Sequence, residues 1–152
     1  MSETVSVTIT QLEQYRFHVD FGAGLPGLIA DEPAPMGSGT GPDPAQMLLS
    51  AVANCLSASL LFACTKFKQD PGGITATATG HIGRNERNRL RVSRIEVSIR
   101  LGRPGAEIEH LDRLLDQFED FCTVAQSVQA GVPVHVRVED NAGVALKTPG
   151  DS

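Results

Sequence analysis

Hydrophobic and polar residues alternate along five stretches of the chain, and this period of two is typical of half-buried β-strands. The five stretches are residues 4–10, 14–21, 74–82, 90–101 and 132–138. A short apolar segment at residues 28–30 predicts one further strand. The alternation in the fourth stretch shifts by one residue near Ser93 and Arg94, which predicts a β-bulge there.

A long helix is predicted between the third and fourth strands. Asp43 suits its N-cap and Pro44 its first position, where the missing N–H of proline costs nothing. The helix extends to about Lys68, and the run Pro71-Gly72-Gly73 stops it. It is apolar on nearly all sides, so we expect it to lie in the centre of the fold.

Two further helices are expected, an amphipathic one at residues 106–121 and a short one at residues 123–130. The element order βββ-α-ββ-αα-β predicts an α+β fold with mainly antiparallel sheets around the long central helix. We expect a single domain over residues 1–152, because this length suits one hydrophobic core. Residues 141–152 are expected to form a loosely held tail.

The charge of the chain limits its partners. Its 152 residues carry a formal net charge of −5, which argues against nucleic acid or an anionic membrane as a partner. One basic run, residues 84–94, is interrupted by asparagine and glutamate, and we interpret it as a solvated hairpin tip rather than a phosphate-binding patch.

The longest apolar run, residues 47–64, has about the minimum length of a membrane span. It contains Asn54 and three serines, so we expect a helix buried inside protein. The first ten residues resemble no targeting signal, and three cysteines without a secretion signal suit a reducing compartment. The sequence therefore predicts a soluble, cytoplasmic protein.

Two cysteines have settings that favour chemistry. Cys55 lies in the middle of the long helix among small side chains, which leave room for a molecule to approach the sulfur. Cys122 lies where one helix ends and another begins, and a helix N-terminus favours thiolate over thiol. If the fold brings them together, one sulfur can react with a peroxide and the other can resolve the sulfenic acid as a disulfide. The competing interpretation is that both are inert core residues, because free cysteine is commonly buried.

Other kinds of site find little support. Cys64 is nine residues from Cys55, which places it on the opposite side of the helix, where it is expected to fill the core. The sequence has no CxxC or HxxxH spacing for a metal ion and no GxSxG elbow for a serine nucleophile. The glycine-rich run GSGTGPDP lacks the lysine of a phosphate-binding loop.

Two runs resemble the signatures of the OsmC/Ohr superfamily, the osmotically inducible protein C and organic hydroperoxide resistance proteins. GPDPAQMLLSAVANCLSASL is similar to its G-x-x-P turn and central helix with a cysteine in the middle. FCTVAQSVQAGVPVHVRV is similar to its second signature, in which a cysteine opens a short helix before the last strand. The resemblance implies an intertwined homodimer with two active sites at the subunit interface. In these sites Cys55 would be peroxidatic and Cys122 resolving.

The activity implied by the resemblance is reduction of organic hydroperoxides without a bound cofactor. A dithiol or lipoyl-type reductant would recycle the disulfide. The peroxidases of the family carry a glutamate ten residues before the first cysteine, which holds an arginine beside the sulfur, and here this position is Ala45. Arg16 is the candidate arginine, with Glu32 or Asp43 as its substitute partner.

The missing glutamate keeps other functions open. One alternative is a non-peroxidase OsmC-like protein that binds a small molecule or responds to redox conditions. Another is a purely structural dimer with inert cysteines. The proline that often follows the second cysteine in the family is replaced here by Thr123.

Overall fold

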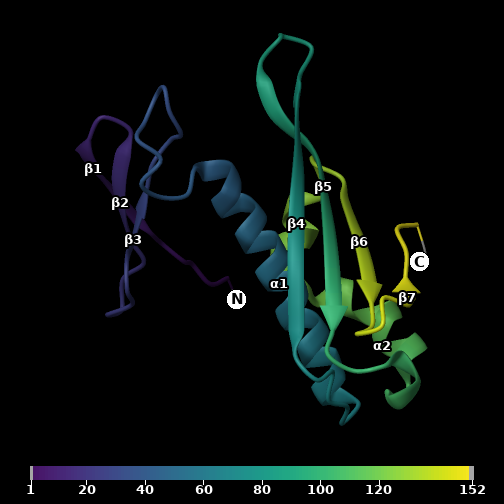
Figure 1. Cartoon of the computed structure of the whole chain (residues 1–152). Coiled ribbons are helices and arrows are strands. Elements are labelled where there is room, and N and C mark those ends of the chain that lie inside the picture. The colour runs from purple at the N-terminus through teal and green to yellow at the C-terminus, as the bar shows by residue number, and fades with distance from the viewer. Residues whose placement is uncertain (1, 151–152) are drawn as a thin grey trace. The chain divides into compact units, whose positions relative to one another are not determined.

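The computed structural model describes residues 2–150, which form an α+β fold of two β-sheets and three α-helices (Figure 1). The fold class agrees with the prediction. By its contacts the chain divides into two compact units, one up to Met47 and one from Leu48 onward. The single domain over residues 1–152 stays a prediction.

The first unit contains a three-stranded antiparallel sheet in the order β1-β2-β3. Its strands are β1 (Thr8–Glu13), β2 (Arg16–Asp20) and β3 (Leu28–Ala30). β1 begins later than the predicted residue 4, because its pairing with β2 starts at Thr8, opposite Asp20, the last residue of β2.

A buried carboxylate organises the loop after β3. Asp31 accepts hydrogen bonds from the backbone N–H groups of Glu32, Ser38 and Thr40 and from the Thr40 hydroxyl, at 2.8–3.3 Å. These bonds, led by the one from the Thr40 hydroxyl, lower the pKa of Asp31 below its usual value of 3.8. The loop that leads into the long helix is therefore held by one ionised side chain.

The long helix α1 (Pro44–Lys66) begins as predicted. The Gln46 N–H donates to Asp43 Oδ1 at 2.8 Å and the Asp43 N–H donates to Gln46 Oε1 at 3.0 Å, which is a reciprocal capping box. At the other end Lys68 adopts a left-handed φ of 56°, and the Gln69 N–H reaches back to the Cys64 carbonyl at 2.8 Å.

α1 is buried along one face only, although its apolar residues extend over nearly all sides of the helix. The buried positions are Val52, Leu56, Ser59, Leu60, Ala63 and Cys64. On another face Leu61 and Phe62 remain 49% and 57% exposed. Among the described residues, α1 is the one helix long and apolar enough to cross a membrane, a test that core helices of soluble proteins also pass.

The second unit contains a four-stranded sheet in the order β4-β5-β6-β7. Its strands are β4 (Ile74–Arg84), β5 (Leu90–Leu101), β6 (Val134–Glu139) and β7 (Ala145–Lys147). The ladder between β4 and β5 pairs His81 with Arg94 and Ile82 with Val92, so Ser93 is the extra residue, which confirms the predicted bulge. β5 and β6 pair in parallel, whereas the other pairs are antiparallel.

A parallel pair requires a crossover, and the helical segment between β5 and β6 supplies it. The single helix predicted at residues 106–121 is wrong. Three shorter pieces replace it, namely η1 (Gly105–Glu107), α2 (Leu111–Gln117) and η2 (Phe118–Phe121), and α3 (Thr123–Val128) follows. The helix is interrupted because His110 has a φ of 60° and the Glu109 N–H donates to the Gln69 side chain instead of a helical carbonyl.

The segment after Asp140 also differs from the prediction of a loose tail. Residues 145–147 form β7 against β6, and the ammonium group of Lys147 is buried against α2. The last two residues of the predicted tail, 151–152, lie outside the described part of the chain.

The hydrophobic core of the second unit lies between the sheet and the helices. Its residues come from the inward faces of β5 and β6, from the buried face of α1, and from α2, η2 and α3. Figure 1 shows α1 running alongside this sheet. Phe118 is fully buried at the centre, and burial of a side chain of this size contributes about 1.5–3 kcal/mol.

Candidate active site

The fold brings Cys55 and Cys122 together. Cys55 lies in the middle of α1 and is half-buried, whereas Cys122 is the fully buried N-cap residue of α3. The two side chains are joined by a hydrogen bond in which the protonated Cys122 thiol donates to the Cys55 sulfur. All three cysteines of the chain are free thiols. Two sulfurs far apart in the sequence are thus neighbours in the structure.

The surroundings of Cys122 favour its neutral form. Burial is the main cause, and with the hydrogen bond to Cys55 it raises the pKa of Cys122 to about 11. Two donors act in the opposite direction, the Ala125 N–H at 3.3 Å and the Ser59 hydroxyl. Cys122 is therefore a protonated thiol at neutral pH.

This result corrects the expectation that the start of a helix would favour the thiolate of Cys122. α3 has only six residues, and the Ala125 N–H is the backbone donor that reaches the sulfur. Burial outweighs this contribution because the charged form would have to be held away from water.

Ser59 is a member of the site that sequence reasoning missed as a hydrogen-bonding partner. In the sequence it is only one of the small side chains around Cys55. Ser59 is buried and lies one turn after Cys55, so the same face of α1 presents both a sulfur and a hydroxyl to Cys122. The spacing of four residues between Cys55 and Ser59 is the feature of the sequence that could have identified Ser59 as part of the site.

Cys64 lies in the core, as the sequence predicted. It is fully buried, and burial, followed by the negative charge of Asp70, raises its pKa above 9.0. It therefore provides a matched internal control for the other two cysteines.

Arg16 lies on β2 in the first unit, where it is half-buried. Its Nε atom is buried and has no hydrogen-bond partner. Across residues 2–150 no ion pair joins it to Glu32 or Asp43, and Asp43 is already used in capping α1. The placement of Arg16 beside the cysteines stays a prediction. Ala45, in the first turn of α1, has no polar side chain to orient a guanidinium.

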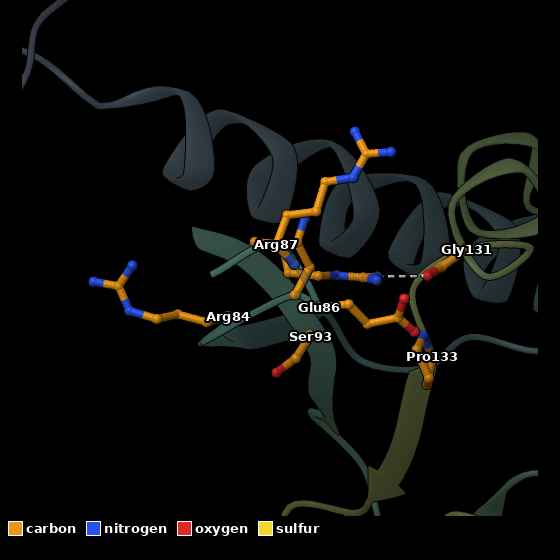
Figure 2. Close-up of a pocket in the computed structure, with 8 residues that line it drawn as sticks. Arg84, Glu86, Arg87, Ser93, Gly131 and Pro133 are labelled. Carbon is orange, nitrogen blue, oxygen red and sulfur yellow. Dashed lines mark hydrogen bonds between the residues drawn. The ribbon is translucent and has the colours of Figure 1, made fainter. Parts of the chain in front are cut away.

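A hollow of about 620 Å³ lies at the tip of the β4–β5 hairpin, and neither Cys55 nor Cys122 lines it. Figure 2 shows that the guanidinium groups of Arg84 and Arg87, which line it, point in different directions. The guanidinium of Arg91, a third arginine of the lining, donates a hydrogen bond of 2.7 Å to the carbonyl of Gly131. Because the cations do not converge, the basic run agrees with the predicted solvated hairpin tip. Within the described residues, no group of three or more metal-ligating side chains forms a metal site.

Comparison with known proteins identifies relatives by sequence model and by fold. The family model described as OsmC-like protein matches residues 37–137. None of the curated proteins matches the sequence significantly. The fold is similar to that of an OsmC-like protein from Mycoplasma pneumoniae, with a TM-score of 0.75 at 16% identity over 92% of this chain and 99% of that one.

Two further solved structures have the same fold. An organic hydroperoxide resistance protein from Elizabethkingia anophelis matches with a TM-score of 0.73 at 20% identity, over 93% of this chain and 100% of that one. An OsmC-like protein of unknown function from Vibrio cholerae matches with a TM-score of 0.73 at 19% identity, over 90% of this chain and 99% of that one.

Proposed function

Because the chain belongs to the OsmC-like protein family, we propose that it is a thiol peroxidase that reduces organic hydroperoxides. The observation that carries the proposal is the hydrogen bond between half-buried Cys55 and buried, protonated Cys122. It gives each sulfur one role. Cys55, the more accessible one, is the nucleophile, and Cys122 is the resolving thiol.

In the first step the Cys55 thiolate attacks one oxygen of the hydroperoxide. A sulfur–oxygen bond forms, the oxygen–oxygen bond breaks, and the alcohol leaves after taking up a proton. In the second step the Cys122 sulfur attacks the Cys55 sulfenic acid. A disulfide forms, and the hydroxide leaves as water with the proton that Cys122 gives up. A dithiol or lipoyl-type reductant then reduces the disulfide and is itself oxidised.

Arg16 has a supporting role in this proposal. A guanidinium near a sulfur stabilises the thiolate through its opposite charge. The buried Nε of Arg16 lacks a hydrogen-bond partner, which supports a role toward a group other than its present neighbours. Free cysteines suit a reducing compartment, so we assign the protein to the cytoplasm, and we propose no nucleic-acid or membrane partner.

A second candidate function rests on Ala45. Without a carboxylate at this position, and with no ion pair on Arg16 among the described residues, the site lacks the usual orienting pair. A non-peroxidase OsmC-like protein that binds a small molecule or responds to redox conditions would need no such pair.

Mass spectrometry of the thiols separates these functions. When reduced protein receives one equivalent of cumene hydroperoxide, we expect rapid loss of two hydrogen atoms and a peptide cross-link between Cys55 and Cys122. The Cys64→Ser variant should behave identically, because Cys64 lies in the core away from the pair. Thiols that stay reduced in the presence of peroxide would refute the peroxidase and leave the second function.

We also propose that the protein is a homodimer in which a second copy covers the exposed face of α1. Leu61 and Phe62 are large apolar side chains that are about half-exposed on this helix. The ring centres of Phe62 and of the exposed Phe121 lie 5.9 Å apart. An apolar patch of this kind on a core helix is typical of a protein–protein interface.

The Phe62→Glu variant is expected to dissociate the dimer. Burial of a phenylalanine contributes about 1.5–3 kcal/mol, and twofold symmetry doubles the loss, so the dimer dissociation constant should rise at least about a hundredfold. Light scattering after gel filtration measures the mass. Val144→Glu, which alters an equally exposed residue outside the helices, is the matched control. A wild-type monomer, or a Phe62→Glu dimer as tight as the control, would contradict the proposal.

A further inference from the structure

Lys147, near the end of the chain, is a buried lysine with three contacts in one helical segment. It is 8% exposed, and its Nζ donates to the Leu115 carbonyl at 2.9 Å. The same Nζ forms an ion pair of 2.6 Å with Glu119 and lies 5.3 Å from the centre of the Phe118 ring. A buried ammonium is costly unless it is paired, so these contacts fix β7 against α2 and η2.

Glu119 connects this lysine to the resolving cysteine. Its carbonyl accepts a hydrogen bond from the Cys122 N–H at 3.1 Å and another from the Gln126 side chain at 3.2 Å. The Cys122 carbonyl in turn accepts from the Gln126 N–H at 2.9 Å. The side chain of Glu119 is therefore held by Lys147 while its backbone holds Cys122.

We propose that Lys147 is a positioning residue for disulfide closure, which keeps Cys122 in reach of Cys55 through the ion pair with Glu119. The inference rests on the proposed function and extends it to a residue outside the pair of cysteines. A disulfide requires a sulfur–sulfur distance of about 2.05 Å, so two sulfurs in hydrogen-bond contact must still approach each other before the bond can form. A fixed Cys122 backbone keeps its sulfur directed at Cys55 during this approach.

Lys147 lies outside residues 37–137, the part of the chain that matches the family model. The ion pair therefore joins β7, which lies beyond the matched span, to Glu119, which lies within it. The Glu119 side chain is 30% exposed, whereas that of Lys147 is 9% exposed.

The experiment measures the second step separately from the first. Reduced protein is mixed with cumene hydroperoxide, and mass spectrometry of quenched samples follows the Cys55 sulfenic acid and the Cys55–Cys122 disulfide. In Lys147→Met we expect Cys55 to be oxidised at the wild-type rate and the disulfide to close about 10- to 100-fold more slowly, as for a misplaced reacting group. With excess peroxide, more Cys55 should then end as sulfinic acid.

Glu119→Gln provides a second variant that removes the ion pair at a partly exposed position, so the result does not depend on Lys147→Met folding well. The double variant should close no more slowly than the slower single variant, because both changes remove one interaction. Lys66→Met is the matched control. It removes a lysine that lies 5.6 Å from the exposed ring of Phe121 and forms no ion pair in the described part of the chain.

Two outcomes would overturn the inference. One is disulfide closure at the wild-type rate in both Lys147→Met and Glu119→Gln, and the other is faster closure in either variant. Oxidation by diamide instead of peroxide distinguishes this failure from failure of the proposed function. Diamide can form the disulfide even in a protein without peroxidase activity. With diamide, the rates of disulfide formation in the wild type and the variants should follow the same order as with peroxide.

Discussion

Replacing Cys55 with serine is expected to lower the rate of organic hydroperoxide reduction at least about a thousandfold, because the reaction then has no sulfur nucleophile. The buried Cys122 cannot take over, since its pKa of about 11 leaves it protonated at neutral pH. Consumption of cumene hydroperoxide in the presence of a dithiol measures the rate. Cys64→Ser should retain wild-type activity.

Cys122→Ser is the informative companion to this variant. It should consume one equivalent of peroxide quickly and then stop, with Cys55 found as sulfenic or higher acids. This stop is expected when the dithiol cannot reach the sulfenic acid. Two results would contradict the roles that we assign to the two sulfurs. One is full activity in Cys55→Ser, and the other is a Cys122→Ser variant that fails to consume even one equivalent of peroxide.

The rate of disulfide closure should increase about tenfold for each unit by which the pH rises, or roughly a hundredfold between pH 7 and 9. The attacking form of Cys122 is its thiolate, and a pKa raised to about 11 means that its fraction increases with pH throughout this range. Burial, the largest cause of the raised pKa, persists after Cys55 has been oxidised.

The measurement is the decay of the Cys55 sulfenic acid in a single turnover, followed at several pH values. Decay of the sulfenic acid is separate from its formation, so the ionisation of the peroxide-reactive sulfur does not distort the result. A closure rate that stays constant from pH 7 to 9 would contradict the assignment of Cys122 as a buried, neutral thiol. At a given pH the Ser59→Ala variant should close the disulfide more slowly than the wild type. The Ser59 hydroxyl donates to the Cys122 sulfur and lowers the pKa of Cys122, and the variant loses this effect.

Local patterns predicted the regular elements well where neighbouring residues alone decide them. The N-cap at Asp43 and the bulge near Ser93 are both predicted from the sequence, because each depends on a few adjacent residues. The helix predicted at residues 106–121 failed for the opposite reason. Its spacing of apolar residues is helical, but a contact from Gln69, distant in sequence, competes for the Glu109 N–H.

The same distinction applies to the site. The sequence identified Cys55 and Cys122 by their places on helices, and their proximity then depended on how α1 and α3 pack in one core. The ionisation of Cys122 was predicted with the wrong sign, since a helix start is visible in sequence and the degree of burial is not. Lys147 lies in the segment that the sequence predicts as a loosely held tail, and only the tertiary contacts with Leu115 and Glu119 show that it is buried.

The sequence by itself determined the α+β order of elements, the long helix with a cysteine at its middle, and membership of a family, because these depend on residue type and spacing along the chain. Only the tertiary structure decided that Cys122 is the neutral partner in a hydrogen bond to Cys55, and that the C-terminal strand holds it through Glu119. The physical reason is that charge stabilisation and reach depend on distance and exclusion of water. Both are properties of the packed molecule that no stretch of sequence contains.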